Sequence, residues 1–197
     1  MKNIIFDFGQ VLVHFDPIYM TSRYVPEKED IDLVAEVLFD RLYWDKLDAG
    51  TISDADVVRL ASERVPERLR QPLEKIYYNW IYNIPEIDGM RDAIDICRKK
   101  GFGIYLLSNI SNYFADRKDD IPILSLLDGF VFSAKCGFVK PSAEIFAYTC
   151  KKFDLVPSET LFIDDSEKNA AGAKKFGINA YLFDGDAKKL CDYLQSL

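Results

Sequence analysis

Residues 3–9 read Asn-Ile-Ile-Phe-Asp-Phe-Gly, a short apolar run that ends at an acidic residue. An apolar run of this length is typical of a buried parallel strand. A strand has no structural need for a carboxylate at its carboxyl end, which is where open α/β sheets bind their ligands. The stretch therefore predicts a first strand over Asn3–Phe6 and a functional carboxylate, Asp7, directly after it.

Similar apolar runs recur along the chain and alternate with helical patterns. The alternation predicts an α/β fold with a doubly wound, Rossmann-like parallel sheet. The expected strands are Asn3–Phe6, Gly103–Leu107, Gly129–Phe132, Thr160–Ile163 and Ala180–Phe183, and the expected helices between them are Met90–Lys100, Pro141–Phe153 and Glu167–Phe176.

The interval 16–84 interrupts this alternation, because its patterns are all helical. We expect helices over Asp30–Tyr43, Ser53–Val65 and Pro72–Tyr82, with Ser53 as an N-cap. The interval falls between the first two strands, so we interpret it as an insertion. The sequence predicts a core domain of residues 1–15 and 85–197 and a small helical cap of residues 16–84 packed over the site.

Polar side chains follow the other predicted strands as well. The carboxyl ends of parallel strands share one edge of a sheet, so these side chains are expected to lie near Asp7. They are Ser108 and Asn109 after the second strand, Lys140 after the third, and Asp164 and Asp165 after the fourth.

This set suits phosphoryl transfer with a hard cation. Asp7 can attack phosphorus and form an aspartyl-phosphate. Crowded carboxylates repel one another, and magnesium relieves the repulsion while binding a phosphate oxygen. Lys140, the Ser108 hydroxyl and the Asn109 backbone N–H would hold the phosphoryl oxygens. Each residue alone has a plainer interpretation: Asp7 as a strand-end cap, Asp164–Asp165 as an N-cap and turn, Ser108 as a turn cap, or Lys140 as a solvated lysine. Taken together, these residues favour a phosphoryl-transfer site over the separate structural roles.

The composition excludes several other classes of function. The net charge of −7 argues against nucleic-acid and anionic-membrane partners, which attract basic patches. No apolar stretch approaches the roughly 20 residues of a membrane span, and the apolar run at residues 4–6 is too short for a signal peptide. Widely spaced cysteines in apolar patterns indicate buried free thiols, and we expect a cytoplasmic protein. The cysteines are Cys97, Cys136, Cys150 and Cys191.

Four motifs follow one another in order along most of the chain: 4–9 (IIFDFG), 106–109 (LLSN), 140–146 (KPSAEIF), and 161–166 (LFIDDS) followed by 169–173 (NAAGA). With these motifs, the sequence resembles the haloacid dehalogenase (HAD) superfamily, in particular its phosphohydrolases. The insertion after the first motif is similar to the C1-type cap of that family. The segment 44–53 (WDKLDAGTIS) resembles the sugar-phosphate phosphatase branch, which includes an α-glucose-1-phosphate phosphatase.

The resemblance implies a magnesium-dependent (Mg²⁺) phosphatase that acts on a small-molecule phosphate ester. Asp7 would be the nucleophile and a metal ligand, and the Gly9 carbonyl a second ligand. Asp165 would bind the ion directly, and Asp164 would support it or share the ion. The phosphate would be held by Ser108, Asn109 and Lys140.

Position 9 departs from the family pattern. Most phosphatases of this family carry there a second aspartate, which protonates the leaving group and then activates water. Gly9 can do neither, and such help is typically worth 10²–10⁴-fold in rate. Three explanations are open: a substrate with a good leaving group such as a sugar 1-phosphate, a substituting group, or weak or absent activity. His14, the only histidine, could reach the leaving group, and Tyr43, Trp44 and Asp45 could line the pocket from the cap.

Other functions on the same scaffold stay open. A metal-free 2-haloacid dehalogenase also lacks the second aspartate, although the Asp164–Asp165 pair beside Asp7 favours a cation. A non-catalytic binding protein and a phosphomutase are further alternatives. The sequence identifies neither the substrate nor the oligomeric state, monomer or dimer.

Overall fold

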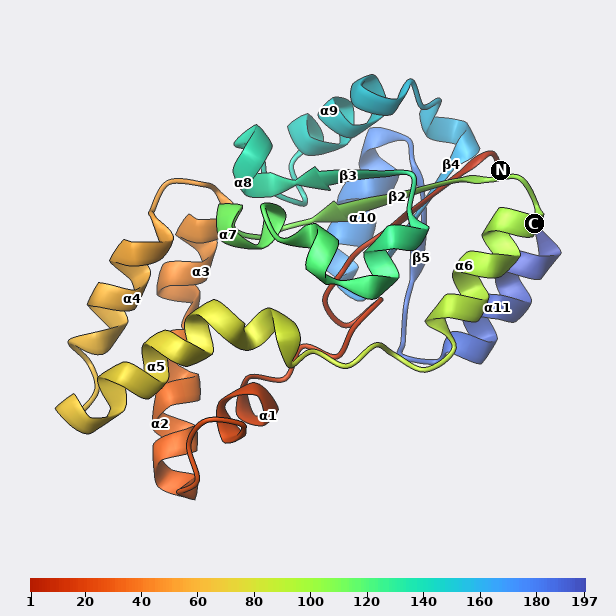
Figure 1. Ribbon diagram of the computed structural model, residues 1–197. Helices are drawn as coiled ribbons and strands as arrows, with labels where there is room; N and C mark the ends of the chain where they lie inside the picture. The colour runs from red at the N-terminus through yellow and green to blue at the C-terminus, as the bar shows by residue number, and fades with distance from the viewer.

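A computed structural model describes all residues, 1–197. Its five parallel strands form one sheet in the order β3-β2-β1-β4-β5, with β1 at the centre (Figure 1). The predicted doubly wound α/β fold is confirmed. β2 extends one residue further than expected, to Ser108, and β5 begins and ends one residue earlier. The strands are β1 (Asn3–Phe6), β2 (Gly103–Ser108), β3 (Gly129–Phe132), β4 (Thr160–Asp164) and β5 (Asn179–Leu182).

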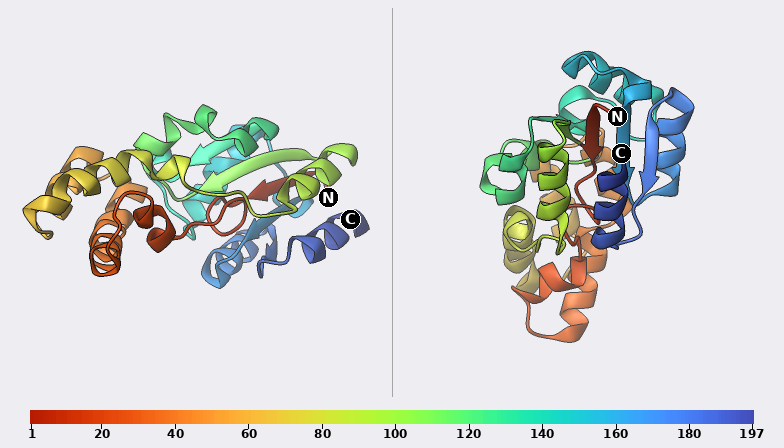
Figure 2. Two further views of the ribbon diagram at one scale, coloured as in Figure 1. Left: turned by 60° about the horizontal axis from the view of Figure 1, so that its bottom comes forward. Right: turned by 90° about the vertical axis from the view of Figure 1, so that its right-hand side faces the viewer.

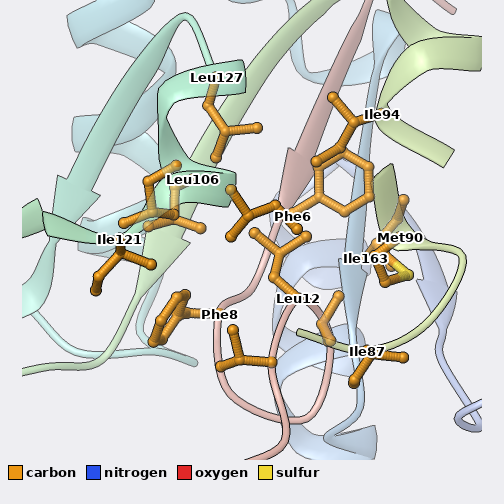
Figure 3. Packing of buried hydrophobic residues seen from close by; sticks show 14 of the residues in the cluster. Phe6, Phe8, Leu12, Ile87, Met90, Ile94, Leu106, Ile121, Leu127 and Ile163 are labelled. Carbon is orange, nitrogen blue, oxygen red and sulfur yellow. The ribbon is translucent and has the colours of Figure 1, made fainter. Parts of the chain in front are cut away.

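The central strand sends alternate side chains to opposite faces of the sheet, as strand geometry requires. Ile4 and Phe6 pack with helices α6 (Met90–Lys99) and α11 (Ala187–Ser196) in a cluster of 30 buried residues, part of which Figure 3 shows. Ile5 belongs to a second cluster on the other face, which is covered by the two helices α9 and α10. Helices therefore lie on both faces of the sheet (Figure 2). The bounds are α9 (Ala143–Phe153) and α10 (Glu167–Phe176).

The start of α9 differs from the prediction. Pro141 was expected to open the helix, but Ser142 still has extended backbone and is the N-cap, so the helix begins at Ala143. The remaining short elements of this part are α7 (Asn112–Ala115), α8 (Ser133–Cys136) and the 3-10 turns Lys118–Asp120, Pro122–Leu126 and Pro157–Glu159.

Residues 17–82 form a separate group of helices beyond the carboxyl ends of the strands (Figure 1). These helices enclose their own cluster of 14 buried apolar residues. They are α1 (Pro17–Ser22), α2 (Lys28–Leu38), α3 (Arg41–Asp48), α4 (Asp54–Ser62), α5 (Glu67–Asn79) and the 3-10 turn Trp80–Tyr82.

The helix boundaries of this group differ from the prediction at several points, among them the end of α4, which lies at Ser62 rather than Val65. The helix expected over 30–43 is two helices, because the Asp40 side chain accepts a hydrogen bond from the Leu42 N–H (2.9 Å) and starts α3. The helix expected to start at Pro72 starts five residues earlier, and Pro72 lies inside it. The predicted N-cap is confirmed, since the Ser53 hydroxyl accepts from the Asp56 N–H. We retain residues 16–84 as the proposed cap.

Two chain crossings connect this group to the sheet, and they lie side by side. The His14 N–H donates to the Pro85 carbonyl (2.8 Å), and the Ile87 N–H donates to the Leu12 carbonyl (3.0 Å). Outgoing and returning segments therefore form a short antiparallel pair at the base of the cap.

All four cysteines are free, as predicted, but only Cys97 and Cys150 are buried; Cys136 and Cys191 are partly exposed. None of the helices has both the length and the apolar character to cross a bilayer. A cytoplasmic location, the absence of nucleic-acid and membrane partners, and the choice between monomer and dimer stay predictions.

Candidate active site

Asp7 lies where the sheet register predicts, next to the end of β4. Phe6 pairs with Ile163, and the Asp7 N–H continues the ladder by donating to the Ile163 carbonyl (2.9 Å). The buried ammonium group of Lys140 lies 2.6 Å from Asp7 Oδ1 and 2.8 Å from Asp164 Oδ2. Lys140 is 5% exposed, so it is not a solvated surface lysine. One cation thus bridges two strand-end carboxylates.

Asp164 is fixed by more partners than Lys140 alone. Its Oδ1 accepts from the Ser166 N–H (2.8 Å), and the Asn169 amide donates to both of its oxygens (3.1 Å each). No separate role was predicted for Asn169, which appeared only as part of the fourth motif. The available signal was its place on the first turns of α10, which Ser166 caps, so that its amide faces back toward the end of β4.

The Asn109 side chain holds the Lys140 loop rather than facing a ligand. Its Oδ1 accepts from the Lys140 N–H (2.8 Å), and its Nδ2 donates to the Lys140 carbonyl (3.2 Å). This reciprocal pair fixes the backbone that carries the central ammonium group. Ser108, at the end of β2, is buried and lines the same cavity as Asp7 and Lys140.

The loop around Lys140 also packs closely against α10. At Gly172, a Cβ atom would lie 2.6 Å from Pro141 Cβ and 2.7 Å from the Pro141 carbonyl oxygen. Only a residue without a side chain allows this approach. Gly172 thereby lets the helix that carries Asn169 and the loop that carries Lys140 meet behind Asp164.

Burial and crowding shift the protonation equilibria. Burial raises the pKa of Asp7 to about 7; Asp164 adds to the rise, and Lys140 opposes it. Burial lowers the pKa of Lys140, but Asp7 and Asp164 more than offset this, so the ammonium form is favoured. Burial and Asp164 also raise the pKa of Asp165. The negative charge here exceeds what one lysine neutralises.

The acidic groups fit a divalent cation. Asp7, Asp164 and Asp165 each present a carboxylate oxygen, and the three oxygens lie within 4.8 Å of one another. Hard cations such as Mg²⁺ bind oxygen ligands of this kind. Asp165 is exposed and has no ion-pair partner, whereas Asp164 is already occupied by Lys140 and Asn169. The arrangement is compatible with Asp165 as the more direct ligand.

A cavity of about 360 Å³, within the size range of small-ligand pockets, opens beside Asp7 and Lys140, which line it. Asp164 and Asp165 are not among its lining residues. Both the sheet edge and the helical group line it. Besides the expected residues, sequence reasoning missed several lining side chains. These are Phe8, Gln10, Phe15, Arg41, Asp48, Trp80, Ile110, Pro141, Ser166 and Lys168, along with Asn169.

The sequence candidates outside the sheet fare differently. Trp44 lines the cavity, and its indole N–H donates to the Leu38 carbonyl (2.8 Å). Tyr43 is buried in the apolar cluster of the helical group, and Asp45 is exposed in an ion pair with Arg41, so neither lines the cavity. His14 is exposed and borders a different cavity, which corrects the suggestion that it reaches the leaving group.

A family model described as haloacid dehalogenase-like hydrolase matches residues 1–177. Two curated proteins are similar over nearly their whole lengths. A D-ribitol-5-phosphate phosphatase of Bacteroides thetaiotaomicron is 25% identical over 92% of this chain and 91% of its own. A sesquiterpene phosphatase of Aspergillus oryzae is 24% identical over 90% of this chain and 87% of its own.

Solved structures share the fold. A HAD family enzyme from Bacteroides thetaiotaomicron, solved as a magnesium complex, superposes with a TM-score of 0.72 at 22% identity, covering 94% of each chain. The same enzyme was also solved in complex with magnesium and inorganic phosphate, and that structure superposes with a TM-score of 0.67 at 22% identity, over 94% of this chain and 96% of that one.

Proposed function

The chain belongs to the haloacid dehalogenase-like hydrolases, and on this basis we propose that it is a magnesium-dependent phosphatase of a small phosphorylated metabolite. The resemblance drawn from its motifs is confirmed at the level of the family. The curated relatives named as phosphatases agree with a phosphoric monoester hydrolase. The observation that carries the proposal is the bridge of Lys140 between Asp7 and the buried Asp164, in which Asp7 and Lys140 line the cavity.

Asp7 is the nucleophile in this proposal. One of its oxygens attacks phosphorus, the ester bond to the leaving oxygen breaks, and an aspartyl-phosphate forms; water then releases inorganic phosphate. Lys140 and the Ser108 hydroxyl stabilise the charge on the phosphoryl oxygens. Lys140 is fixed in place by its contacts before the substrate arrives, and Ser108 is buried at the end of β2. Asn109 and Asn169 act through Lys140 and Asp164, which they position.

Asp7, the Gly9 carbonyl and Asp165 would hold Mg²⁺, with Asp164 beside them. When bound, the ion supplies positive charge to the phosphoryl oxygens and to the crowded carboxylates. Lys140 leaves part of the carboxylate charge unbalanced, and this supports a cation here rather than a metal-free dehalogenase site.

We propose a sugar or alditol phosphate as the substrate. A cavity of about 360 Å³ suits a molecule of that size, and Arg41, Gln10 and Lys168 offer donors for hydroxyl and phosphate groups beside the Trp44 ring. The curated relative that acts on D-ribitol 5-phosphate supports this class. A sugar 1-phosphate, including α-glucose 1-phosphate, is the narrower candidate, since an anomeric oxygen leaves more readily than an ordinary alkoxide.

A phosphate-release assay tests the proposal. The purified protein, with Mg²⁺, is given a panel that includes D-ribitol 5-phosphate, sugar 1- and 6-phosphates, acyl phosphates and nucleotides. We expect release from at least one sugar or alditol phosphate, its loss with EDTA, and its loss in Asp7→Asn but not in Asp32→Asn, an exposed aspartate of α2. No release from any ester, or halide release from 2-haloacids without metal, would overturn the proposal.

A further inference from the structure

We propose that Asp48, at the end of cap helix α3, is the general acid–base of the hydrolysis. It would protonate the leaving oxygen and then activate water, as a side chain at position 9 does in related phosphatases. The inference depends on the proposed phosphatase function and adds to it the group that Gly9 lacks. Asp48 is a lining residue of the same cavity as Asp7, Ser108 and Lys140.

The side of the cavity on which Asp48 lies is the side where the leaving group must be. Phosphoryl transfer brings the attacking and leaving oxygens roughly into line through phosphorus. Asp7 attacks from the edge of the sheet, so the leaving oxygen points away from the sheet and toward the helices that cover the cavity. Asp48 is the last residue of one of those helices, α3.

The Asp48 carboxyl group is buried and unpartnered. It is 7% exposed, and its Oδ1 has no hydrogen-bond partner. The nearest arginine of its helix, Arg41, pairs instead with the exposed Asp45 (2.5 Å). Buried polar atoms are almost always hydrogen-bonded, so an unpartnered carboxyl oxygen on a residue that lines the cavity is an exception, and it supports a role for Asp48 toward a ligand.

The protonation state of Asp48 suits both halves of the reaction. Burial raises the pKa of Asp48 to about 7, with Asp45 adding to the rise and Arg41 and Lys140 opposing it. Its place in the last turn of a helix further disfavours negative charge. A carboxyl group that titrates near neutral pH can give up a proton in one step and take one in the next.

The end of α3 is held against the phosphate side of the site. Gly50, two residues after Asp48, has φ +69°, and a Cβ there would lie 2.8 Å from the Ala134 carbonyl oxygen. Ala134 belongs to α8 and donates its N–H to the Ile110 carbonyl (3.3 Å), directly after the Ser108–Asn109 segment. The distance between Asp48 and the phosphate site is thus set by direct backbone packing.

The steps balance as follows. In the first, Asp7 Oδ bonds to phosphorus, the bond to the leaving oxygen breaks, and the Asp48 proton goes to that oxygen, giving a neutral alcohol. In the second, Asp48 carboxylate takes a proton from water as the water oxygen bonds to phosphorus. The bond to Asp7 breaks, inorganic phosphate leaves, and Asp48 is protonated again.

The test compares two leaving groups in one protein. Asp48→Asn keeps the shape and removes the proton. For D-ribitol 5-phosphate, or whichever alkyl phosphate the wild type hydrolyses fastest, we expect kcat/KM to fall by about 10²–10⁴-fold. For p-nitrophenyl phosphate, whose phenolate leaves without a proton, we expect a fall of less than about tenfold. Asp45→Asn, one turn earlier on the same helix and exposed, is the matched control and should keep its kcat/KM within about twofold.

Two further readouts separate chemistry from structure. In the wild type, kcat/KM for the alkyl phosphate should decline above about pH 7, because the acid form of Asp48 is lost there, and this decline should be absent in Asp48→Asn. Gly9→Asp in the Asp48→Asn background should recover part of the lost rate. A Cβ at Gly9 meets only Phe15 Cβ, at 3.7 Å, so the backbone site accepts a side-chain carbon there.

The outcomes are distinct. If the wild type is active and Asp7→Asn is not, but Asp48→Asn lowers both substrates equally or neither, the role of Asp48 is wrong and the phosphatase stands. If the wild type hydrolyses no phosphate ester, the proposed function itself is wrong. Selective loss with the alkyl phosphate, together with rescue by Gly9→Asp, supports the acid–base role.

Discussion

The sheet edge and the cap contribute to the same cavity in opposite ways. On the sheet edge, the buried charged groups are paired: Lys140 contacts Asp7 and Asp164, and the Asn169 amide donates to Asp164. On the cap, Asp48 is buried without a hydrogen-bond partner for Oδ1. The buried charges of the sheet edge are paired before any ligand binds. The cap, in contrast, has an unpaired carboxyl oxygen that a ligand can use.

This contrast assigns two different tasks to the two sides of the cavity: placement of the phosphoryl group to the sheet edge, and choice of substrate to the cap. A preorganised set of charges stabilises the transferring phosphoryl group without moving at the moment of reaction. The cap contributes an aromatic group in which Trp44 packs edge-on against Phe15 (5.5 Å between ring centroids) and Trp80 (5.7 Å). We propose that these aromatic rings and the unpaired Asp48 carboxyl group contact the part of the substrate beyond the phosphate. We therefore assign substrate choice to the cap.

Removal of the bridging ammonium group should give the largest effect. Lys140→Met leaves two buried carboxylates without their cation, and breaking such a pair typically destabilises by about 3–5 kcal/mol. Urea unfolding at pH 8 in EDTA measures it. Lys28→Met, which removes an exposed i,i+4 pair, should change stability by less than about 0.5 kcal/mol. A loss below about 1 kcal/mol in Lys140→Met would contradict the paired picture of the sheet edge.

Asp48→Asn should act in the opposite direction on stability. Burial raises the pKa of Asp48 to about 7 in the folded protein, well above the ordinary value of an aspartate, so the folded state binds the proton more tightly. The wild type therefore loses stability as pH rises from about 4 to 7. Asn carries no charge and escapes that loss, so the variant should gain a few kcal/mol relative to the wild type at pH 8 and little at pH 4.

Urea unfolding of both proteins at pH 4, 6 and 8 measures this gain. The difference between them is informative, because all other titrating groups are shared. Equal stability at every pH would mean that the carboxyl group is solvated, and the contrast between the two halves of the cavity would be lost.

Thermal unfolding at increasing Mg²⁺ concentration tests whether Asp165 is a ligand of the ion. Mg²⁺ that binds only the folded protein raises Tm with concentration. Asp165→Asn should weaken Mg²⁺ binding by at least about tenfold and flatten this rise, while leaving metal-free stability unchanged or higher because a like charge beside Asp164 is removed. Asp184→Asn is the control, since Asp184 pairs with Lys189 on the surface. An unchanged Mg²⁺ response in Asp165→Asn would remove Asp165 from the ligand set.

The smallest effect concerns the aromatic group of the cap. Trp44→Phe keeps an apolar ring but loses the bond from the indole N–H to the Leu38 carbonyl, worth about 1 kcal/mol. We expect a loss of that size in urea unfolding and a higher KM with little change in kcat. If kcat falls by a larger factor than KM rises, the Trp44 ring acts on the chemical step.

The sheet and its end groups were accessible from sequence because local signals specify them. A buried parallel strand is a continuous apolar run, and a polar residue at its end stands out, as Asp7 and Ser108 do. Parallel pairing then brings the strand ends to one edge without any further information. Lys140 was also identified this way, although its burial between two carboxylates was not.

The cap side of the cavity carried no comparable signal. Asp48 looks like any polar residue of an amphipathic helix, and only the packing of Gly50 against Ala134 turns it toward the site. The same limit explains the misplaced cap helices, since α2 ends at Leu38 and Asp40 starts a second helix by accepting a hydrogen bond from the Leu42 N–H. His14 and Tyr43 have suitable side chains, but His14 borders a different cavity and Tyr43 is buried in the apolar cluster of the cap.

The paired crossings at the base of the cap have an evolutionary consequence. The chain leaves the sheet after Leu12 and returns at Ile87, and these segments are hydrogen-bonded to each other. The two ends of the inserted segment therefore lie together. The entropic cost of closing such a loop rises only slowly with its length. A gene segment for another helical insert can replace this one without disturbing the strand that carries Asp7. New substrates can thus be acquired by exchange of the insert while the phosphate chemistry is inherited unchanged.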